Sequence, residues 1–181
     1  MKNCGVVCAA VALAVTVIGV APAAAQDAGK TGLVMTTDSS VGLTIRASDS
    51  VAVRPSISFG RSTSDFGGLA DGERTTTSWS PGVSVVFYVK TWDATRLYLS
   101  PQWVYSRSRS SDEGGANEVT STGHSLAAML GAQHNLGSRF AVFGEVGVGR
   151  STSEGTNLLG AINNSGHNWA TRSAIGAILF F

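Results

Sequence analysis

The residues best suited to chemistry in this chain are a histidine, a serine and a glutamate. His124 and Ser125 are adjacent, and Glu145 follows further along the chain. Such a set could hydrolyse an acyl bond only if the base lay within hydrogen-bond reach of the nucleophile. The surrounding residues alternate between apolar and small or polar types, which predicts strands, and neighbours in a strand point to opposite faces. His124 and Ser125 therefore share a site only if a bulge intervenes, and we predict no catalytic residues.

The other candidates for chemistry are weaker still. His134 is followed by Asn135, and His167 lies in a stretch rich in Gly, Asn and Ser, so neither has a serine two residues away on a strand. The chain has no cluster with the spacing of a zinc site. Gly147 and Gly149 lack the following helix that a phosphate-binding loop needs. We therefore expect no metal, no cofactor and no enzymatic activity.

The N-terminus has the features of an export signal. A short start with one lysine precedes an uncharged, mostly apolar run over residues 4–20. Ala23 and Ala25 then supply the small-x-small pattern of a cleavage site. We predict cleavage after Ala25, which gives a signal peptide of residues 1–25 and one domain of residues 26–181. Both cysteines of the chain leave with the signal, so we expect no disulfide in the mature protein.

The predicted mature chain is electrically balanced. Removing the signal takes away Lys2, which leaves twelve basic and twelve acidic residues. A chain without a basic excess offers no electrostatic case for nucleic acid as a partner. After the signal there is no apolar run near the ~18 residues that a membrane helix requires. An exported chain of this kind is periplasmic, secreted or an outer-membrane barrel.

Strand periodicity runs through the whole mature chain. Six stretches alternate strongly, two near the start alternate weakly, and tight turns alternate with longer polar loops. At about 9–11 residues per membrane crossing, this rhythm predicts an all-β, eight-stranded antiparallel up-and-down transmembrane β-barrel, because closure favours an even strand number. The strong strands are expected at 51–62, 76–90, 95–109, 118–134, 139–151 and 168–181, the weak ones at 33–35 and 41–45, and the longer loops at 64–73, 110–117 and 152–167.

Aromatic residues distinguish this prediction from the alternative of a soluble sandwich. Trp, Tyr or Phe flank the apolar faces near their ends, as in the two aromatic girdles of a membrane barrel. The opposite faces carry mainly Ser, Gly and Ala, which are small enough for a narrow lumen. The last strand, NWATRSAIGAILFF, ends on Phe181 with no polar tail.

The export signal, the uneven hairpin loops and the ending Ala-Ile-Leu-Phe-Phe resemble the small OmpA/OmpX-like outer-membrane β-barrels. The resemblance implies a location in the bacterial outer membrane. It also implies the barrel-assembly machinery as a partner, with Phe181 as the assembly signal. Deacylases among such barrels place His and Ser two residues apart on one strand, and we expect no such pair on an ordered strand of this chain.

Five charged residues are expected to point into the lumen, namely Arg54, Lys90, Arg96, Glu145 and Arg172. Because a buried carboxylate without a partner is costly, Glu145 should pair with an arginine. Arg54 and Arg172 are the candidates, and Arg172 is the easier one because it lies on the neighbouring strand. Such a charge network would plug the lumen.

Arg107 and Arg109 are expected at the outer rim, where they would contact lipopolysaccharide phosphates or simply keep the base of the loop soluble. The function that we expect is structural or surface interaction, in adhesion or envelope integrity, with host or surface ligands bound through the loops. The alternatives are a narrow porin-like channel and a lipid A-modifying enzyme.

Overall fold

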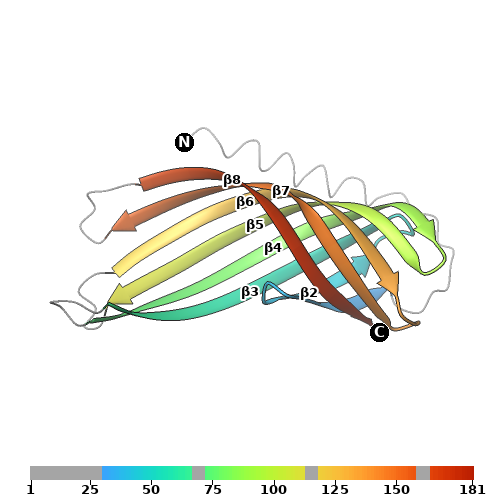
Figure 1. Ribbon diagram of the computed structural model, residues 1–181, viewed down its shortest axis with the longest axis horizontal. Coiled ribbons are helices and arrows are strands. Elements are labelled where there is room, and N and C mark those ends of the chain that lie inside the picture. The colour runs from blue at the N-terminus through green and yellow to red at the C-terminus, as the bar shows by residue number, and fades with distance from the viewer. Residues whose placement is uncertain (1–29, 67–71, 113–117, 158–163) are drawn as a thin grey trace.

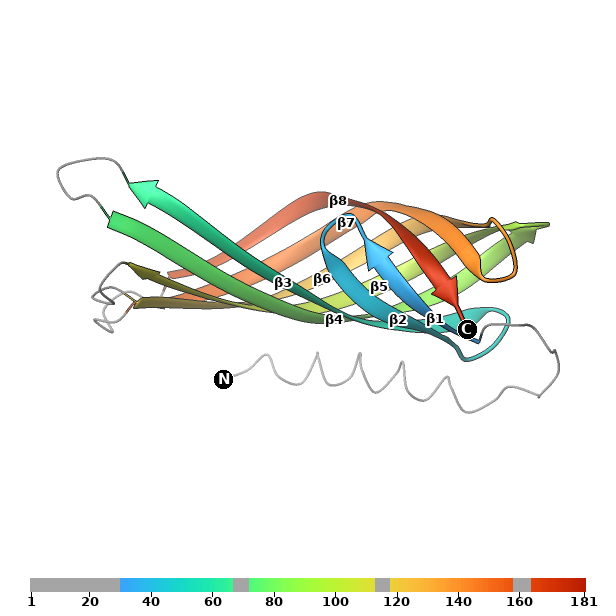
Figure 2. The same ribbon diagram turned by 90° about the horizontal axis from the view of Figure 1, so that it is seen from below.

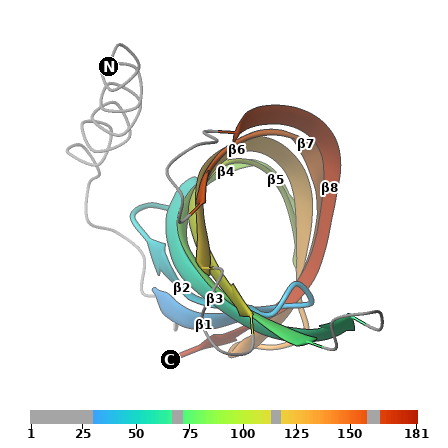
Figure 3. The ribbon, with the colours of Figure 1, turned by 90° about the vertical axis from the view of Figure 1, so that its left-hand side faces the viewer.

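The alternating strands close into a barrel. A computed structural model of the protein describes residues 30–66, 72–112, 118–157 and 164–181. Each strand pairs antiparallel with its neighbour in sequence, and β8 pairs back with β1 (Figures 1 and 3). The predicted all-β, eight-stranded antiparallel barrel is therefore confirmed, including the two weak strands. The strands are β1 (Thr31–Thr36), β2 (Ser40–Arg46), β3 (Val51–Phe66), β4 (Gly72–Trp92), β5 (Thr95–Asp112), β6 (Glu118–Asn135), β7 (Phe140–Asn157) and β8 (Asn164–Phe180).

The predicted signal peptide, residues 1–25, and its cleavage site lie outside the described residues. Among the residues that are described, no helix has the length and apolar character needed to cross a membrane.

The six later strands are longer than a membrane crossing requires. They contain 16 to 21 residues each, against about 9–11 for a crossing. The predicted loops at 64–73, 110–117 and 152–167 were therefore too long, because strand pairing continues into each of them. The reason is that Ser and Thr side chains pair across strands as well as apolar ones do, as Thr76 and Ser110 do at 2.8 Å.

Outward-facing residues form an apolar band with aromatic borders. Directly paired residues share a face, so Leu97, Ala132, Gly144 and Ile175 form one row across β5 to β8. The end of the barrel that holds turns 47–50, 93–94 and 136–139 and the C-terminus is called the turn end, and the opposite one the loop end. Large exposed rings border the band at both: Phe140 and Phe181 at the turn end, and Phe59, Trp79 and Trp169 toward the loop end.

The lumen is filled by side chains. Towards the turn end, Val34, Phe143, Ile178 and Phe180 form a buried apolar cluster with Ala141. A second cluster joins Ala52, Val86 and Tyr98. Glycines opposite the rings make room for them: a Cβ on Gly131 would lie 2.4 Å from Cζ of Tyr98, and a Cβ on Gly176 would lie 2.4 Å from Cζ of Phe143.

The wall of the barrel is lower on one side. β1 and β2 have only 6 and 7 residues, and their turn at 37–39 lies partway up the barrel (Figure 2). Pairing of β2 with β3 ends at Ser40 and Ser58, and pairing of β1 with β8 ends at Thr36 and Gly176. Past this turn, β3 pairs only with β4 and β8 only with β7. We call the space between residues 59–66 of β3 and 164–174 of β8 the side gap.

Candidate functional site

An ion pair crosses the lumen from one wall to the opposite one. Arg54 lies on β3 and Glu145 on β7, four strands apart in a ring of eight. An Arg54 nitrogen donates to Oε1 of Glu145 at 2.9 Å, and the side chains are 6% and 5% exposed. Because the barrel is narrow, opposite strands come within reach of a single pair of long side chains.

Three further strands contribute to the same network. The Tyr98 hydroxyl on β5 donates to Oε1 of Glu145 at 2.7 Å, and the Gln102 amide on the same strand donates to Oε2 at 2.9 Å. Arg54 also donates to Oε1 of Gln133 on β6 at 3.4 Å, and the Tyr88 hydroxyl on β4 donates to that same oxygen at 3.1 Å. The carboxylate thus accepts three hydrogen bonds, which is what a buried charge requires.

Aromatic rings hold the guanidinium from the sides. Its central carbon lies 5.1 Å from the Tyr98 ring centroid and 4.8 Å from that of Phe143, within the range of cation–π attraction. Arg54 and Glu145 are thereby fixed by charge, hydrogen bonds and packing together. We call the five residues Arg54, Tyr98, Gln102, Gln133 and Glu145 the lumen network. Chemically it resembles a plug: most of its donors and acceptors are bonded within the network or to Tyr88 and Asn135, although Nε of Arg54 has no partner among the described residues.

The expectation that Arg172 is the easier partner of Glu145 was wrong. Arg172 lies on the neighbouring strand, but its side chain runs over Gly149 of β7 and donates to Oγ of Ser125 on β6 at 2.6 Å. Gly149 permits this course, since a Cβ there would lie 2.8 Å from Nε of Arg172. Arg172 does point into the lumen, where it joins no ion pair among the described residues.

The expected inward position of Lys90 was also wrong. The register of β4 with β5 shifts between Tyr88 and Lys90, so the alternation of faces is reset by one residue. Lys90 pairs with Leu97, an outer-face residue, and its Nζ lies 4.8 Å from the ring centroid of Trp92. Arg96 keeps an inward position, 5.4 Å from the Tyr88 ring, without joining the lumen network.

His124 and Ser125 lie on opposite faces of β6. The His124 ring is on the outside, with its centroid 6.0 Å from that of Trp103 and 5.3 Å from that of Tyr105. Ser125 is on the inside and accepts from Arg172. The structure therefore separates His124 from Ser125, and Glu145 is engaged elsewhere. The expectation that His167 lies in a loop was wrong, because β8 begins at Asn164 and carries Ser165 and His167 two residues apart. Both of these residues are exposed toward the loop end. Within the described ranges, His, Cys, Asp and Glu form no group of three that could hold a metal ion.

A polar cavity of about 250 Å³ occupies the lumen on the loop side of the ion pair. Arg54 and Glu145 form its floor, and Asp38, Ser58 and Arg172 are among its walls. The cavity therefore reaches the turn of the β1–β2 hairpin, the β8 border of the side gap, and β3 just below the gap.

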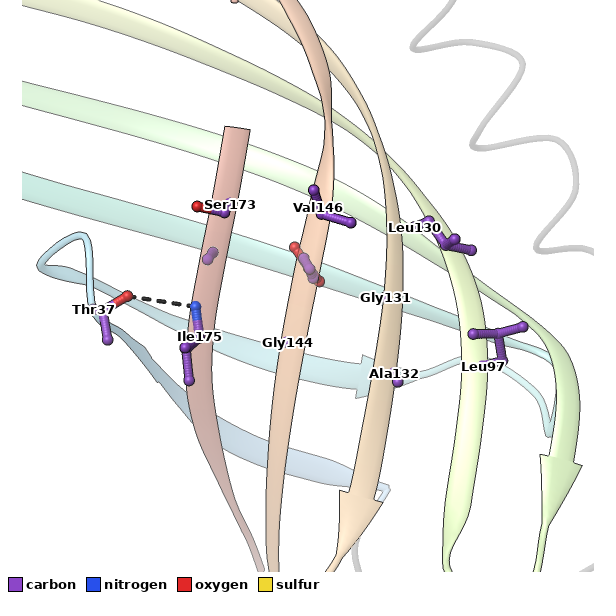
Figure 4. Close-up of a pocket in the computed structure, with 11 residues that line it drawn as sticks. Thr37, Leu97, Leu130, Gly131, Ala132, Gly144, Val146, Ser173 and Ile175 are labelled. Atoms are coloured by element: carbon purple, nitrogen blue, oxygen red, sulfur yellow. Dashed lines mark hydrogen bonds between the residues drawn. The ribbon is translucent and has the colours of Figure 1, made fainter. Parts of the chain in front are cut away.

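A second hollow lies on the outer face. It has a volume of about 480 Å³ and is largely apolar. Small residues at Ala132 and Gly144 form its base, and Leu97, Leu130 and Ile175 rise around it (Figure 4). The hollow opens outward, away from the lumen, on the side of the wall that carries the apolar band.

The remaining predicted residues lie at the two ends. Arg107 and Arg109 are exposed on β5 toward the loop end, and Arg109 forms an ion pair with Glu118. Phe181 is 71% exposed at the turn end, and its backbone nitrogen donates to the Thr31 carbonyl at 3.0 Å.

Three members of the lumen network were not singled out from the sequence. Tyr98, Gln102 and Gln133 all fall on inward positions of their strands, so the alternation alone could have indicated them. These three residues have polar ends, and Glu145 needs polar partners inside the lumen. That combination was the signal that could have identified them.

Comparisons with known proteins bear on the fold. No family model matches the chain, and no curated protein matches it in sequence. Among solved structures, a major outer membrane protein from Thermus thermophilus is similar with a TM-score of 0.56 and 11% identity, over 84% of this chain and 99% of that one. Acinetobacter baumannii CarO2 gives a TM-score of 0.43 at 12% identity, over 87% and 100% of the two chains. Ail of Yersinia pestis, the attachment invasion locus protein, gives 0.39 at 15% identity, over 83% and 95%.

The similarity to the Thermus protein extends over nearly all of that chain, and it supports a common architecture. The predicted resemblance to small outer-membrane barrels is therefore confirmed at the level of fold.

Proposed function

We propose that this protein is a non-enzymatic β-barrel of the bacterial outer membrane, with a sealed lumen and a structural or surface-interaction role. The observation that carries the proposal is the lumen network. An ion pair whose two members are 6% and 5% exposed, bonded from one wall of the barrel to the opposite one, supports a lumen that is closed at that level.

Several features support the location. The outer face carries an apolar band with aromatic residues at its borders, as lipid-facing barrel surfaces do. The predicted signal of residues 1–25 supplies the export route, and the barrel fold is shared with an outer membrane protein of Thermus thermophilus. The Phe181 ring, exposed beside the end of β8, is available to the assembly machinery as a C-terminal signal.

A surface role follows from the strand lengths. β3 to β8 continue past the aromatic border toward the loop end, which places their polar ends clear of the membrane. These projecting ends offer a site for adhesion or for contacts with other envelope components. A large surface ligand would be bound by the projecting strands and the loops, since the lumen cavity above the network has a volume of only about 250 Å³.

Arginines on the outer face suit lipopolysaccharide as a lipid partner. Arg61, Arg107 and Arg150 are exposed and each lies two residues beyond a ring or apolar side chain of the band, at Phe59, Tyr105 and Val148. Guanidinium groups at that height would meet the phosphates of the outer leaflet. Arg109 contributes less, because Glu118 already neutralises it.

The test combines location and activity on one preparation. Outer-membrane fractionation should recover the protein, and the detergent-purified barrel should migrate faster on gels before boiling than after it. Incubation with lipid A should release no fatty acid. Recovery in a soluble fraction without detergent would overturn the location, and turnover of lipid A would establish the enzyme alternative instead.

A further inference from the structure

The side gap brings the polar lumen into contact with the membrane. On the β8 border, Trp169 and Ile175 are 66% and 65% exposed on the outer face, and on the β3 border Phe59 is 68% exposed. The gap therefore begins within the apolar band and crosses its aromatic border. An opening at this height adjoins the outer leaflet.

Backbone chemistry requires polar material in the gap. Along residues 59–66 and 164–174, each strand pairs on one edge only, so every second N–H and C=O along the other edge has no strand partner. Directly below the gap, the Ile175 nitrogen donates to Oγ1 of Thr37 at 3.4 Å (Figure 4). Between Ala170 and Ala174, below the aromatic border, such an edge is not tolerated against hydrocarbon, so water or another hydrophilic group has to satisfy it.

Arg172 makes a negatively charged group the preferred occupant of the gap. It lies on β8 beside the gap, lines the lumen cavity, and donates to a neutral serine hydroxyl. The other arginine of the cavity, Arg54, is already neutralised by Glu145. Asp38 also borders the cavity from the hairpin turn, where it is exposed and forms no ion pair with Arg172. Arg172 is thus the partly buried cation available to an anion.

The other side chains that line the cavity suit a ligand group rich in oxygen atoms. Hydroxyl groups line it from β2, β3 and β4, and they both donate and accept hydrogen bonds. Its volume of about 250 Å³ would hold a phosphate with its esterified first carbons but is too small for a long alkyl chain as well. The apolar hollow of the outer face begins at Thr37, Ser173 and Ile175, directly beside the same gap.

We propose that the side gap is a lateral binding site for an anionic amphiphile of the outer leaflet, whose phosphate head enters the lumen and bonds Arg172 while its alkyl chain stays outside along Ile175. The proposal rests on the membrane location of the proposed function. It adds a ligand class and a route that the structural role does not require.

The experiment uses the full mature chain, refolded in dodecyl maltoside, a neutral detergent. Dodecyl phosphate with a photoreactive diazirine in its chain is titrated by calorimetry and then crosslinked. We expect saturable binding, with affinity about tenfold lower in Arg172→Gln, because one charge-assisted contact is lost. The matched control Arg139→Gln removes an exposed arginine at the turn end, far from the gap, and should change the affinity by less than about twofold.

The crosslinks report the route. Labels concentrated on Phe59, Trp169, Ser173 and Ile175 would support entry through the gap with the chain outside. Labels inside the lumen, or spread evenly over the apolar band, would overturn it. Inorganic phosphate should bind at least about tenfold more weakly, because it lacks the chain; equal binding would mean that free phosphate enters from the loop end and that the lateral route is wrong.

Two controls separate this proposal from the proposed function. Each variant must keep heat-modifiable migration, which shows that it has folded. A wild-type protein that inserts into vesicles but binds no dodecyl phosphate would overturn the lateral site and leave the membrane location intact. A protein that fails to insert would overturn the location itself.

Discussion

Replacing Glu145 with alanine should destabilise the folded barrel by about 3 kcal/mol, the lower end of the range for breaking a buried ion pair. The substitution leaves the Arg54 guanidinium without its counter-charge at 2.9 Å. It also removes the acceptor of the Tyr98 hydroxyl and of the Gln102 amide. The lower end applies because the cavity beside the pair admits water to Arg54, and because two aromatic rings continue to attract the guanidinium.

The assay is urea-driven unfolding of the refolded protein in phosphatidylcholine vesicles, followed by tryptophan fluorescence. Glu154→Ala is the matched control, since Glu154 is exposed on the same strand, and its effect should stay within about 0.5 kcal/mol. The double variant Arg54→Met with Glu145→Leu removes both charges and should recover most of the loss, to within about 1 kcal/mol of the wild type.

Two results would refute this account of the lumen network. One is an unfolding free energy for Glu145→Ala equal to that of Glu154→Ala. The other is a double variant whose loss equals the sum of its two single substitutions, because that would mean that Arg54 and Glu145 are energetically independent.

Three further predictions concern other parts of the barrel. Gly131→Ala should cost about 1–3 kcal/mol of stability in the same unfolding assay, because its Cβ would press on the Tyr98 ring, whereas Gly144→Ala, with open space around it, should be close to neutral. Phe181→Ser should lower the amount of protein assembled in the outer membrane of cells while leaving refolding into vesicles unchanged; equal assembly would count against Phe181 as a signal. Arg107→Gln should weaken binding to lipopolysaccharide vesicles by about two- to fivefold, as for a single exposed charged contact; no change, or an equal loss in Lys90→Gln at the opposite end, would contradict the rim site.

The fold was readable from the sequence because its main signal is local. Side chains alternate with period two along each strand, and the barrel inherits that alternation directly, as in β7, where Phe143 and Glu145 point inward while Val142 and Val146 point outward. Strand ends were less predictable. Polar pairs such as Thr76 and Ser110 extend the ladder without any apolar signal.

The site depended on information that alternation does not carry. The bulge before Lys90 reverses the face of that residue, and nothing in the local sequence marks it. Adjacency in the sheet favoured Arg172 as the partner of Glu145, but reach across a narrow lumen favoured Arg54. Alternation along the strands thus indicated which charges were candidates for the lumen, while the pairing was decided by the barrel diameter and by the room that Gly149 gives to Arg172.

The central claim is that the lumen network seals the barrel, and single-channel recording in planar bilayers tests it most directly. Wild-type protein, with insertion verified in parallel by heat-modifiable migration of the same vesicle preparation, should give a quiet baseline over the full range of applied voltage. Reproducible open-channel steps from the wild-type protein, with a conductance that scales with salt concentration, would contradict the sealed lumen and establish the narrow channel in its place.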